Sequence, residues 1–161
     1  MINATMCYLN VDGRTLFLYR NLGEKDIHNG MYVPPGGRTE RNERGIDCVV
    51  REFREETGLR LINPKLRAIA TFYNEGRLMG GKKDPEDWLV EVYQASEFMG
   101  DLREEHPQAK PIWVPDAALK GLRMHPGDRA IMKRIKRDGV HQILMQYDKK
   151  KLIRFEARRV D

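Results

Sequence analysis

The order of apolar and polar residues along the chain predicts a series of strands interrupted by two helices. Alternation with a period of two and short apolar runs predict strands at Ala4–Asn10, Thr15–Arg20, Leu66–Tyr73, Trp88–Gln94, Ile112–Val114, His141–Tyr147 and Leu152–Arg158. The dipeptide Asp12-Gly13 predicts a tight hairpin between the first two strands. A turn at Asp148–Lys150 is expected to join the last two strands into a second hairpin.

Two segments have the periodicity of helices. The first, about Arg44 to Thr57, has apolar residues at positions i, i+3, i+4 and i+7, and Gly58 is a natural stop after it. The second is expected from about Gly127 to Arg137. The residues from Asn21 to Gly37 are expected to be a loop, since the cluster Pro34-Pro35-Gly36-Gly37 at its end disfavours helix and strand alike.

Strands with interspersed helices indicate an α+β fold, in which a mixed β-sheet lies in an α/β/α sandwich. The 161 residues have the length of one ordinary domain, so a single domain over residues 1–161 is expected. No apolar run approaches the ~20 residues of a membrane span. We expect a cytoplasmic protein with no membrane partner, because there is no evident secretory signal and the two cysteines form neither a metal-binding nor a disulfide-rich spacing. Monomer and homodimer both stay open.

The net charge of +5 is concentrated near the C-terminus. Residues 133–161 contain ten Lys or Arg and four Asp or Glu, a net charge of +6. A basic segment of this kind suits an anionic ligand such as a polyphosphate or a nucleic acid. A basic segment is also typical of a solvated surface, and we favour this second interpretation.

Three carboxylates are brought together by helical spacing. Glu52, Glu55 and Glu56 occupy positions i, i+3 and i+4, so they project from one face of the first helix, largely away from its apolar stripe. Clustered carboxylates repel one another, and hard oxygen ligands favour Mg²⁺, with Mn²⁺ as a substitute. The hexamer Arg51–Glu56 would alone be typical of a solvated helix, but it follows the Gly36-Gly37 turn and Glu43 at fixed distances.

The segment GRTERNERGIDCVVREFREETGL, residues 37–59, resembles the Nudix box, G-x5-E-x7-R-E-U-x-E-E-x-G-U with U apolar, at every specified position. The resemblance implies a Nudix fold and a hydrolase of phosphoanhydride bonds that depends on Mg²⁺. It implies that Glu52, Glu55, Glu56 and the Gly37 carbonyl are metal ligands and that Arg51 orients the carboxylates. It also implies support from Glu43 and Gly36. Many members have Ser or Thr as the N-cap of this helix where this chain has Arg44, so a weaker cap is expected.

Outside the box the chain is similar to the MutT-like 8-oxo-dGTP diphosphatases. The resemblance rests on LYRN at Leu18–Asn21, the loop Asp26–Tyr32, the segment Phe98–Leu102, the tripeptide Trp113-Val114-Pro115, Gly127-Asp128 and the C-terminal hairpin. It implies a nucleoside triphosphate pyrophosphohydrolase, with oxidised purine nucleotides such as 8-oxo-dGTP as candidate substrates and DNA repair as a candidate role.

The same resemblance suggests four substrate-binding residues. Asp128 is expected to read the purine edge, although it would also stabilise a helix N-terminus. His125 falls where an aromatic residue stacks on the base, and Arg20 lies at the strand end. Val33 falls where mammalian members have a base-reading Asn, which weakens the expectation of strict 8-oxoguanine selectivity.

Two further features stay open. Many members have an additional glutamate outside the box, and the aligned residue is Gln108, with Glu104 and Glu105 nearby. The general base is therefore unassigned, with Glu55 and Glu56 as candidates. Residues 74–86 form a longer loop than in the relatives, and its MGGKK stretch is a basic lid or, preferentially, a tolerated insertion.

Three functions compete. The first is hydrolysis of nucleoside triphosphates to monophosphate and pyrophosphate. The second is a Nudix hydrolase of RNA 5′ ends or dinucleoside polyphosphates, supported by the basic C-terminus. The third is a non-catalytic nucleotide-sensing module, against which the complete set of carboxylates argues.

Overall fold

The computed structural model describes residues 1–21, 23, 28–75, 86–103 and 109–161. Its elements in chain order are β1 (Ile2–Val11), β2 (Arg14–Arg20), β3 (Tyr32–Val33), β4 (Gly36–Arg38), α1 (Gly45–Thr57), β5 (Arg60–Ile62), β6 (Lys65–Glu75), β7 (Trp88–Ala95), β8 (Glu97–Met99), β9 (Ala109–Pro115), the 3-10 helix η1 (Asp116–Gly121), α2 (Pro126–Arg134), β10 (His141–Asp148) and β11 (Lys151–Arg159).

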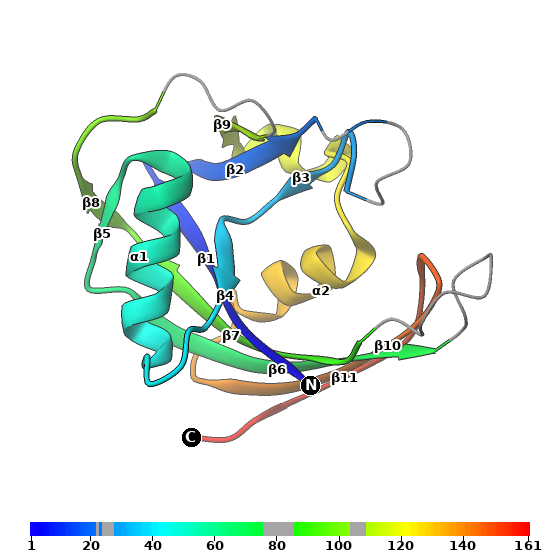
Figure 1. The fold of residues 1–161 in the computed structure, drawn as a ribbon. Helices are drawn as coiled ribbons and strands as arrows, with labels where there is room; N and C mark the ends of the chain where they lie inside the picture. The colour runs from blue at the N-terminus through cyan, green and yellow to red at the C-terminus, as the bar shows by residue number, and fades with distance from the viewer. Residues whose placement is uncertain (22, 24–27, 76–85, 104–108) are drawn as a thin grey trace.

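A curled mixed sheet of nine strands forms the centre of the fold (Figure 1). Its main order is β11-β10-β6-β7-β1-β2-β3, with β4 paired to β1 and β9 paired to β2. The pairs β1–β7 and β6–β10 are parallel, and the other pairs in the sheet are antiparallel. The predicted first hairpin is confirmed, and its turn residues Asp12 and Gly13 both have positive φ angles of 51° and 73°.

The two helices cover opposite faces of this sheet, which confirms the predicted layered α+β fold. Along β1, Met6 and Tyr8 belong to the core beside α2, whereas Cys7 and Leu9 belong to the core beside α1. This division follows from the alternation of side chains in a strand. Since both faces of β1 are buried, the strand holds the two sides of the molecule in register.

α1 begins and ends close to the predicted residues. Arg44 occupies the N-cap without a side-chain hydrogen bond, and Gly58 ends the helix with φ 82°. Val49 and Phe53 are fully buried, as expected for the apolar stripe. α2 ends at Arg134, three residues before the expected Arg137. With 13 and 9 residues, α1 and α2 are both too short to cross a membrane, and the described part of the chain has no longer helix.

The expected loop from Asn21 to Gly37 is wrong at its end, because β3 and β4 lie within or overlap it. β4 pairs antiparallel with β1, with Gly36 opposite Met6 and Gly37 opposite Thr5. The glycines are required here, since a Cβ on Gly36 would collide with the backbone of Thr5 and Met6. The local propensity of Pro34-Pro35-Gly36-Gly37 disfavours a strand, but pairing with β1 nevertheless makes Gly36–Arg38 one. The short strands β5 and β8 and the helix η1 were not predicted.

Replacing Gly36 by Ala should destabilise the protein, because the new Cβ meets backbone atoms that cannot move aside. We expect a loss of about 2 kcal/mol or more in the free energy of unfolding, measured by chemical denaturation. Gly121→Ala is the matched control, since no described residue beyond its own helix and chain neighbours has an atom within 4 Å of the position that its Cβ would take. Equal stabilities of the two variants would contradict this account of β4.

Candidate active site

Two carboxylates of α1 lie against the two glycines of β4. The backbone N–H of Gly36 donates a 2.9 Å hydrogen bond to Oε1 of Glu56. The carboxylate of Glu52 lies beside Gly37, where a Cβ would collide with it. Gly36 and Gly37 therefore each contact one glutamate of α1, and the absence of a Cβ on Gly37 allows Glu52 to approach this closely.

Glu55 lies differently from its two neighbours. Its side chain is 59% exposed, compared with 19% for Glu52 and 22% for Glu56. The predicted single exposed face of three carboxylates is therefore divided: two glutamates face β4 and the third faces solvent. The reason is the 3.6-residue turn, which separates Glu55 from the line that joins Glu52 and Glu56.

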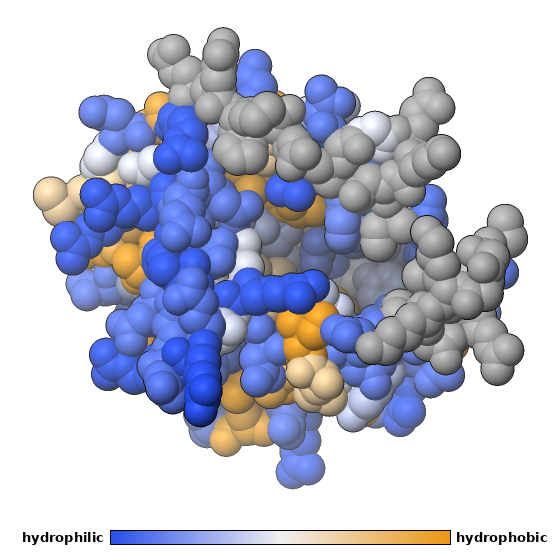
Figure 2. Space-filling model, viewed as in Figure 1, coloured by the Kyte–Doolittle hydropathy of each residue, from blue (hydrophilic) through white to orange (hydrophobic). Residues whose placement is uncertain are grey.

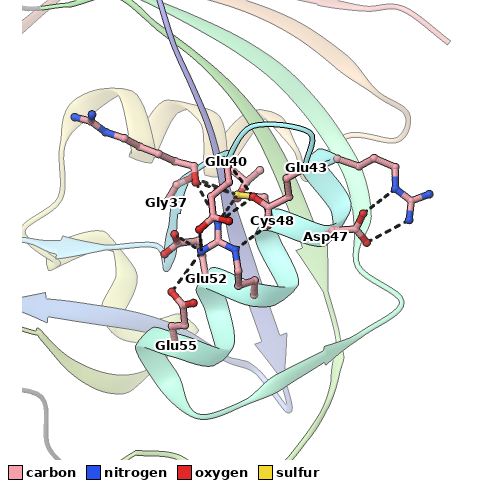
Figure 3. A network of polar contacts seen from close by, with 11 residues as sticks. Gly37, Glu40, Glu43, Asp47, Cys48, Glu52 and Glu55 are labelled. Atoms are coloured by element: carbon pink, nitrogen blue, oxygen red, sulfur yellow. Dashed lines mark hydrogen bonds and ion pairs between the residues drawn. The ribbon is translucent and has the colours of Figure 1, made fainter.

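Arg51 connects the carboxylates of this region (Figure 3). It forms two hydrogen bonds to Glu43, at 2.7 and 2.9 Å, and one of 2.8 Å to Glu52. A longer contact of 3.4 Å reaches Glu55, and the carbonyl of Arg38 accepts a bond of 3.2 Å. This arrangement lowers the pKa of Glu43 to about 2, chiefly through the hydrogen bond from Arg51. Arg51 thus keeps Glu43 ionised and fixes the position of Glu52.

Cys48 fills the space beneath the glycine turn. Its thiol lies 3.7 Å from the carbonyl oxygen of Gly37 and 3.5 Å from that of Arg38, and it accepts a hydrogen bond of 3.3 Å from the Thr5 hydroxyl. The side chain is completely buried. Burial raises the pKa of the thiol, so Cys48 is a neutral packing residue that helps to fix the carbonyls above it.

Glu56 occupies the least favourable position for a negative charge. Burial is the main cause that raises its pKa to about 7, and the nearby charge of Glu52 adds to the effect. The Gly36 N–H and Arg20, whose Nη1 lies 3.9 Å from Oε2 of Glu56, act in the opposite direction. Arg20 therefore lies beside the carboxylates, at the end of β2, as a positive charge at the edge of the site.

The donors around the glycine turn fit a hard divalent cation. Glu52 and Glu56 supply carboxylate oxygens, and Gly37 supplies a backbone carbonyl. A bound cation would offset the free-energy cost of holding the ionised Glu56 carboxylate in a buried position beside the negative charge of Glu52. In the described residues, no three His, Cys, Asp or Glu side chains form a ready metal cage. Mg²⁺ does not require one, because it usually retains waters and binds one or two carboxylates together with substrate phosphates.

A second group of candidate site residues lies at the start of α2. His125 is the N-cap of α2, and its Nε2 lies 2.7 Å from Nδ1 of His28, with the two rings edge to face. Burial is the main cause that lowers the pKa of His125 to about 4, so its ring is neutral at pH 7. The sequence did not indicate His28, because its pairing with His125 joins positions 97 residues apart.

Asp128 lies in the first turn of α2 and is half-buried. Burial raises the pKa of its carboxyl to about 7. The neighbouring Gly127 N–H donates a 2.6 Å hydrogen bond to the hydroxyl of Tyr147, and Tyr8 donates one of 2.9 Å to the Asp128 carbonyl. Hydrogen bonds to side chains of β1 and β10 therefore fix the backbone on which the Asp128 carboxyl is carried.

The comparisons with known proteins agree with this geometry. The family described as NUDIX domain matches residues 1–135. The chain belongs to the Nudix family. It is 32% identical over 129 residues to the uncharacterized Nudix hydrolase YvcI of Bacillus subtilis (strain 168), an overlap of 80% of this chain and 75% of that protein. Hydrolysis of a phosphoanhydride bond is the reaction class of this family.

Two solved structures show the same fold. A mutator MutT protein from Bacillus halodurans has a TM-score of 0.81 at 24% identity, covering 98% of this chain and 97% of that chain. The NUDIX domain of Shewanella oneidensis NrtR, solved with ADP ribose, has a TM-score of 0.66 at 12% identity, covering 84% and 86%. The first similarity includes the β10–β11 hairpin, which lies beyond the residues matched by the NUDIX domain.

The remaining candidate residues from the sequence lie outside the two groups described above. Val33 lies in β3, half-buried and paired with Leu18 of β2. The basic hairpin tip, residues 149–151, is exposed, and the charge of Lys150 contributes to the lowered pKa of His125. The MGGKK stretch, Glu104, Glu105 and Gln108 lie outside the described residues.

The raised pKa of Asp128 predicts a pH dependence of stability. Since the folded-state pKa exceeds the ordinary value of 3.8, the folded state binds the proton more tightly, and stability falls as pH rises from about 4 to about 7. Asp128→Asn should lack this component. His125 and Glu56 also titrate in this range, but they are unchanged in the variant.

The measurement is the free energy of unfolding of both proteins between pH 4 and 8. We expect the difference to change by about 2 kcal/mol across this range, roughly half of the full shift because the side chain retains contact with water. Parallel curves for the two proteins would show that Asp128 titrates normally.

Proposed function

We propose that this Nudix protein is a Mg²⁺-dependent nucleoside triphosphate pyrophosphohydrolase. The observation that supports this proposal is the cluster of groups at β4. Glu56 accepts a hydrogen bond from the Gly36 N–H, Glu52 lies against Gly37, and Arg20 lies beside Glu56. Carboxylates and a backbone carbonyl for a metal, with a cationic side chain beside them, are components that phosphoanhydride cleavage requires. The overall reaction converts a nucleoside triphosphate and water to a nucleoside monophosphate and pyrophosphate.

The residues divide the work as follows. Glu52, Glu56 and the Gly37 carbonyl would hold the cation, and Mn²⁺ would serve in place of Mg²⁺. When bound, the cation supplies charge neutralisation at the phosphates and makes the attacking water more acidic. Arg51 holds Glu52 in position through a 2.8 Å hydrogen bond. Glu55 retains an exposed carboxylate, so it is the candidate that accepts the proton of the attacking water.

Oxidised purine nucleotides such as 8-oxo-dGTP are the candidate substrates. Asp128 and His125 lie together at the start of α2, and a protonated or ionised Asp128 can donate to or accept from a purine edge. The similarity of the fold to MutT proteins points in the same direction. Val33 offers no side-chain hydrogen bond, so the base is read without the Asn of mammalian members.

A second candidate is a larger substrate, either an RNA 5′ end or a dinucleoside polyphosphate. The exposed lysines at residues 149–151 support it, because Lys150 lies close enough to His125 to influence its pKa. A non-catalytic nucleotide-sensing domain is the candidate of another class. The NrtR domain was solved with ADP ribose, so a domain of this fold can bind a nucleotide ligand. The positions of Glu52 and Glu56 beside the glycines of β4 favour catalysis over sensing in this chain.

Glu52→Gln and Glu56→Gln should each lower kcat by about a hundredfold or more, because the amide removes the negative charge that the cation requires. The fold should persist, since a glutamine oxygen at position 56 can still accept the hydrogen bond from Gly36. Calorimetric titration with Mn²⁺ should show weakened metal binding. Glu97→Gln, on an exposed position of β8, is the matched control. Variants with the wild-type rate would remove Glu52 and Glu56 from the active site.

The substrate class is tested by a panel of nucleoside triphosphates, 8-oxo-dGTP, dinucleoside polyphosphates, ADP-ribose and triphosphorylated RNA, each with Mg²⁺. The proposal predicts the highest kcat/KM for a purine nucleoside triphosphate and only a mild dependence on salt. If RNA is the substrate, KM should instead rise steeply between about 50 and 200 mM salt, as counterion release requires. A chain that binds these ligands and hydrolyses none of them would be a sensing domain.

A further inference from the structure

The guanidinium of Arg38 lies over the indole ring of Trp88, 5.2 Å from the ring centroid. The two residues come from different parts of the sequence, since Arg38 ends β4 and Trp88 begins β7. Arg38 is exposed, and no ion pair or hydrogen bond of its guanidinium is found with the described residues. The aromatic ring is therefore the one partner that this cation has in the described part of the chain.

Trp88 belongs to an aromatic surface on the inner face of the sheet. In the register of β6 and β7, Phe72 is directly opposite Trp88. Phe72 stacks on Tyr147 of β10, with their rings 18° from parallel. All three side chains lie on the face covered by α2, and Trp88 and Phe72 retain partial exposure. A flat, partly accessible ring near a hollow is the surface on which a nucleobase can stack.

This surface connects the two halves of the site. Tyr147 accepts the hydrogen bond of Gly127, next to Asp128 at the start of α2. Arg38 directly follows Gly37, and its carbonyl is held by Arg51 of the carboxylate network. Figure 2 shows that the molecular face is hollowed beside the hydrophilic ridge of α1. β4 and β7 both pair with β1, with Arg38 opposite Ala4 and Trp88 opposite Ile2, so the Arg38–Trp88 contact adjoins the glycines of β4.

We infer that Trp88 is the surface on which the nucleobase stacks and that Arg38 covers it in the free protein. On binding, the base takes the place of the guanidinium on the indole, and the released guanidinium pairs with a phosphate beside Gly37. This inference rests on the proposed nucleotide substrate. It assigns base stacking to Trp88, whereas the sequence pointed to His125, whose ring already contacts His28 edge to face.

The replacement of the guanidinium by the base is physically reasonable, because both Trp88 and Arg38 form a stronger interaction in the complex than with each other. An exposed cation–π contact is weak, whereas a base stacked on an aromatic side chain and an Arg–phosphate pair are both stronger. Arginine suits the second role, since its planar guanidinium binds phosphate oxygens in pairs. The position next to Gly37 limits the movement to side-chain rotation, because the backbone of Arg38 stays paired with Ala4 of β1.

Fluorescence of Trp88 tests the inference directly. The chain has two tryptophans, so Trp113→Phe leaves Trp88 as the single emitter. Trp113 packs against the core beside α1, on the other side of the sheet. GMP, the product expected from GTP, should quench the emission as the base stacks, whereas pyrophosphate, which has no base, should not quench it. Unchanged emission at GMP concentrations that calorimetry shows to be saturating would overturn the inference.

Binding measurements on variants test the two roles separately. Trp88→Leu should weaken GMP binding by about tenfold, and Trp88→Phe, which keeps a flat ring, by less. Arg38→Ala should reduce the preference for GMP over guanosine, because the phosphate loses its partner while the indole becomes uncovered. Arg41→Ala is the matched control, since it removes an exposed arginine three residues further along the same turn.

The outcomes separate this inference from the proposed function. Equal GMP binding by Trp88→Leu and wild type, or equal effects of Arg38→Ala and Arg41→Ala, would show that the Arg38–Trp88 contact is structural only. If GMP quenches Trp88 but the protein hydrolyses no nucleoside triphosphate, the stacking surface stands and the proposed reaction is wrong.

Discussion

The close contact between α1 and β4 is the constraint on which the site depends. Glu52 can approach the main chain only because Gly37 has no side chain, and β4 can pair with β1 only because Gly36 has none. β4 is in turn held by β1, which also pairs with β7 and β2. A single buried strand therefore positions the glycine turn, and the glycine turn positions the carboxylates. Few substitutions are tolerable at this point, because backbone atoms occupy the space beside Gly36.

The charges around this contact are unequally compensated. Arg51 pairs with both Glu43 and Glu52, so these two carboxylates share one positive charge. Among the described residues, the Gly36 N–H and the Arg20 guanidinium at 3.9 Å favour the ionised form of Glu56, but burial still raises its pKa to about 7. A site that leaves one carboxylate undercompensated has a lower stability by itself and a higher affinity for a cation. This imbalance is typical of functional sites, where stability and function compete.

The substrate-binding site that we propose draws on parts of the chain that are far apart in sequence. His28, from the segment before β3, contacts His125 at the start of α2. Arg38 of β4 covers Trp88 of β7, which lies opposite Phe72 of β6. Contacts within the fold thus bring together segments that are distant along the chain. The reaction centre is thus compact in sequence, whereas the proposed base site is assembled from dispersed residues.

The sequence was sufficient to predict the carboxylate cluster and the main elements. Residues 37–59 contain the turn, the helix periodicity and the carboxylates within one continuous segment, so local spacing was sufficient to locate them. Only the tertiary structure shows that Gly36–Arg38 is a strand and that Trp88 lies under Arg38. These features depend on pairing register and on contacts between distant segments, and neither leaves a periodic signal in the sequence.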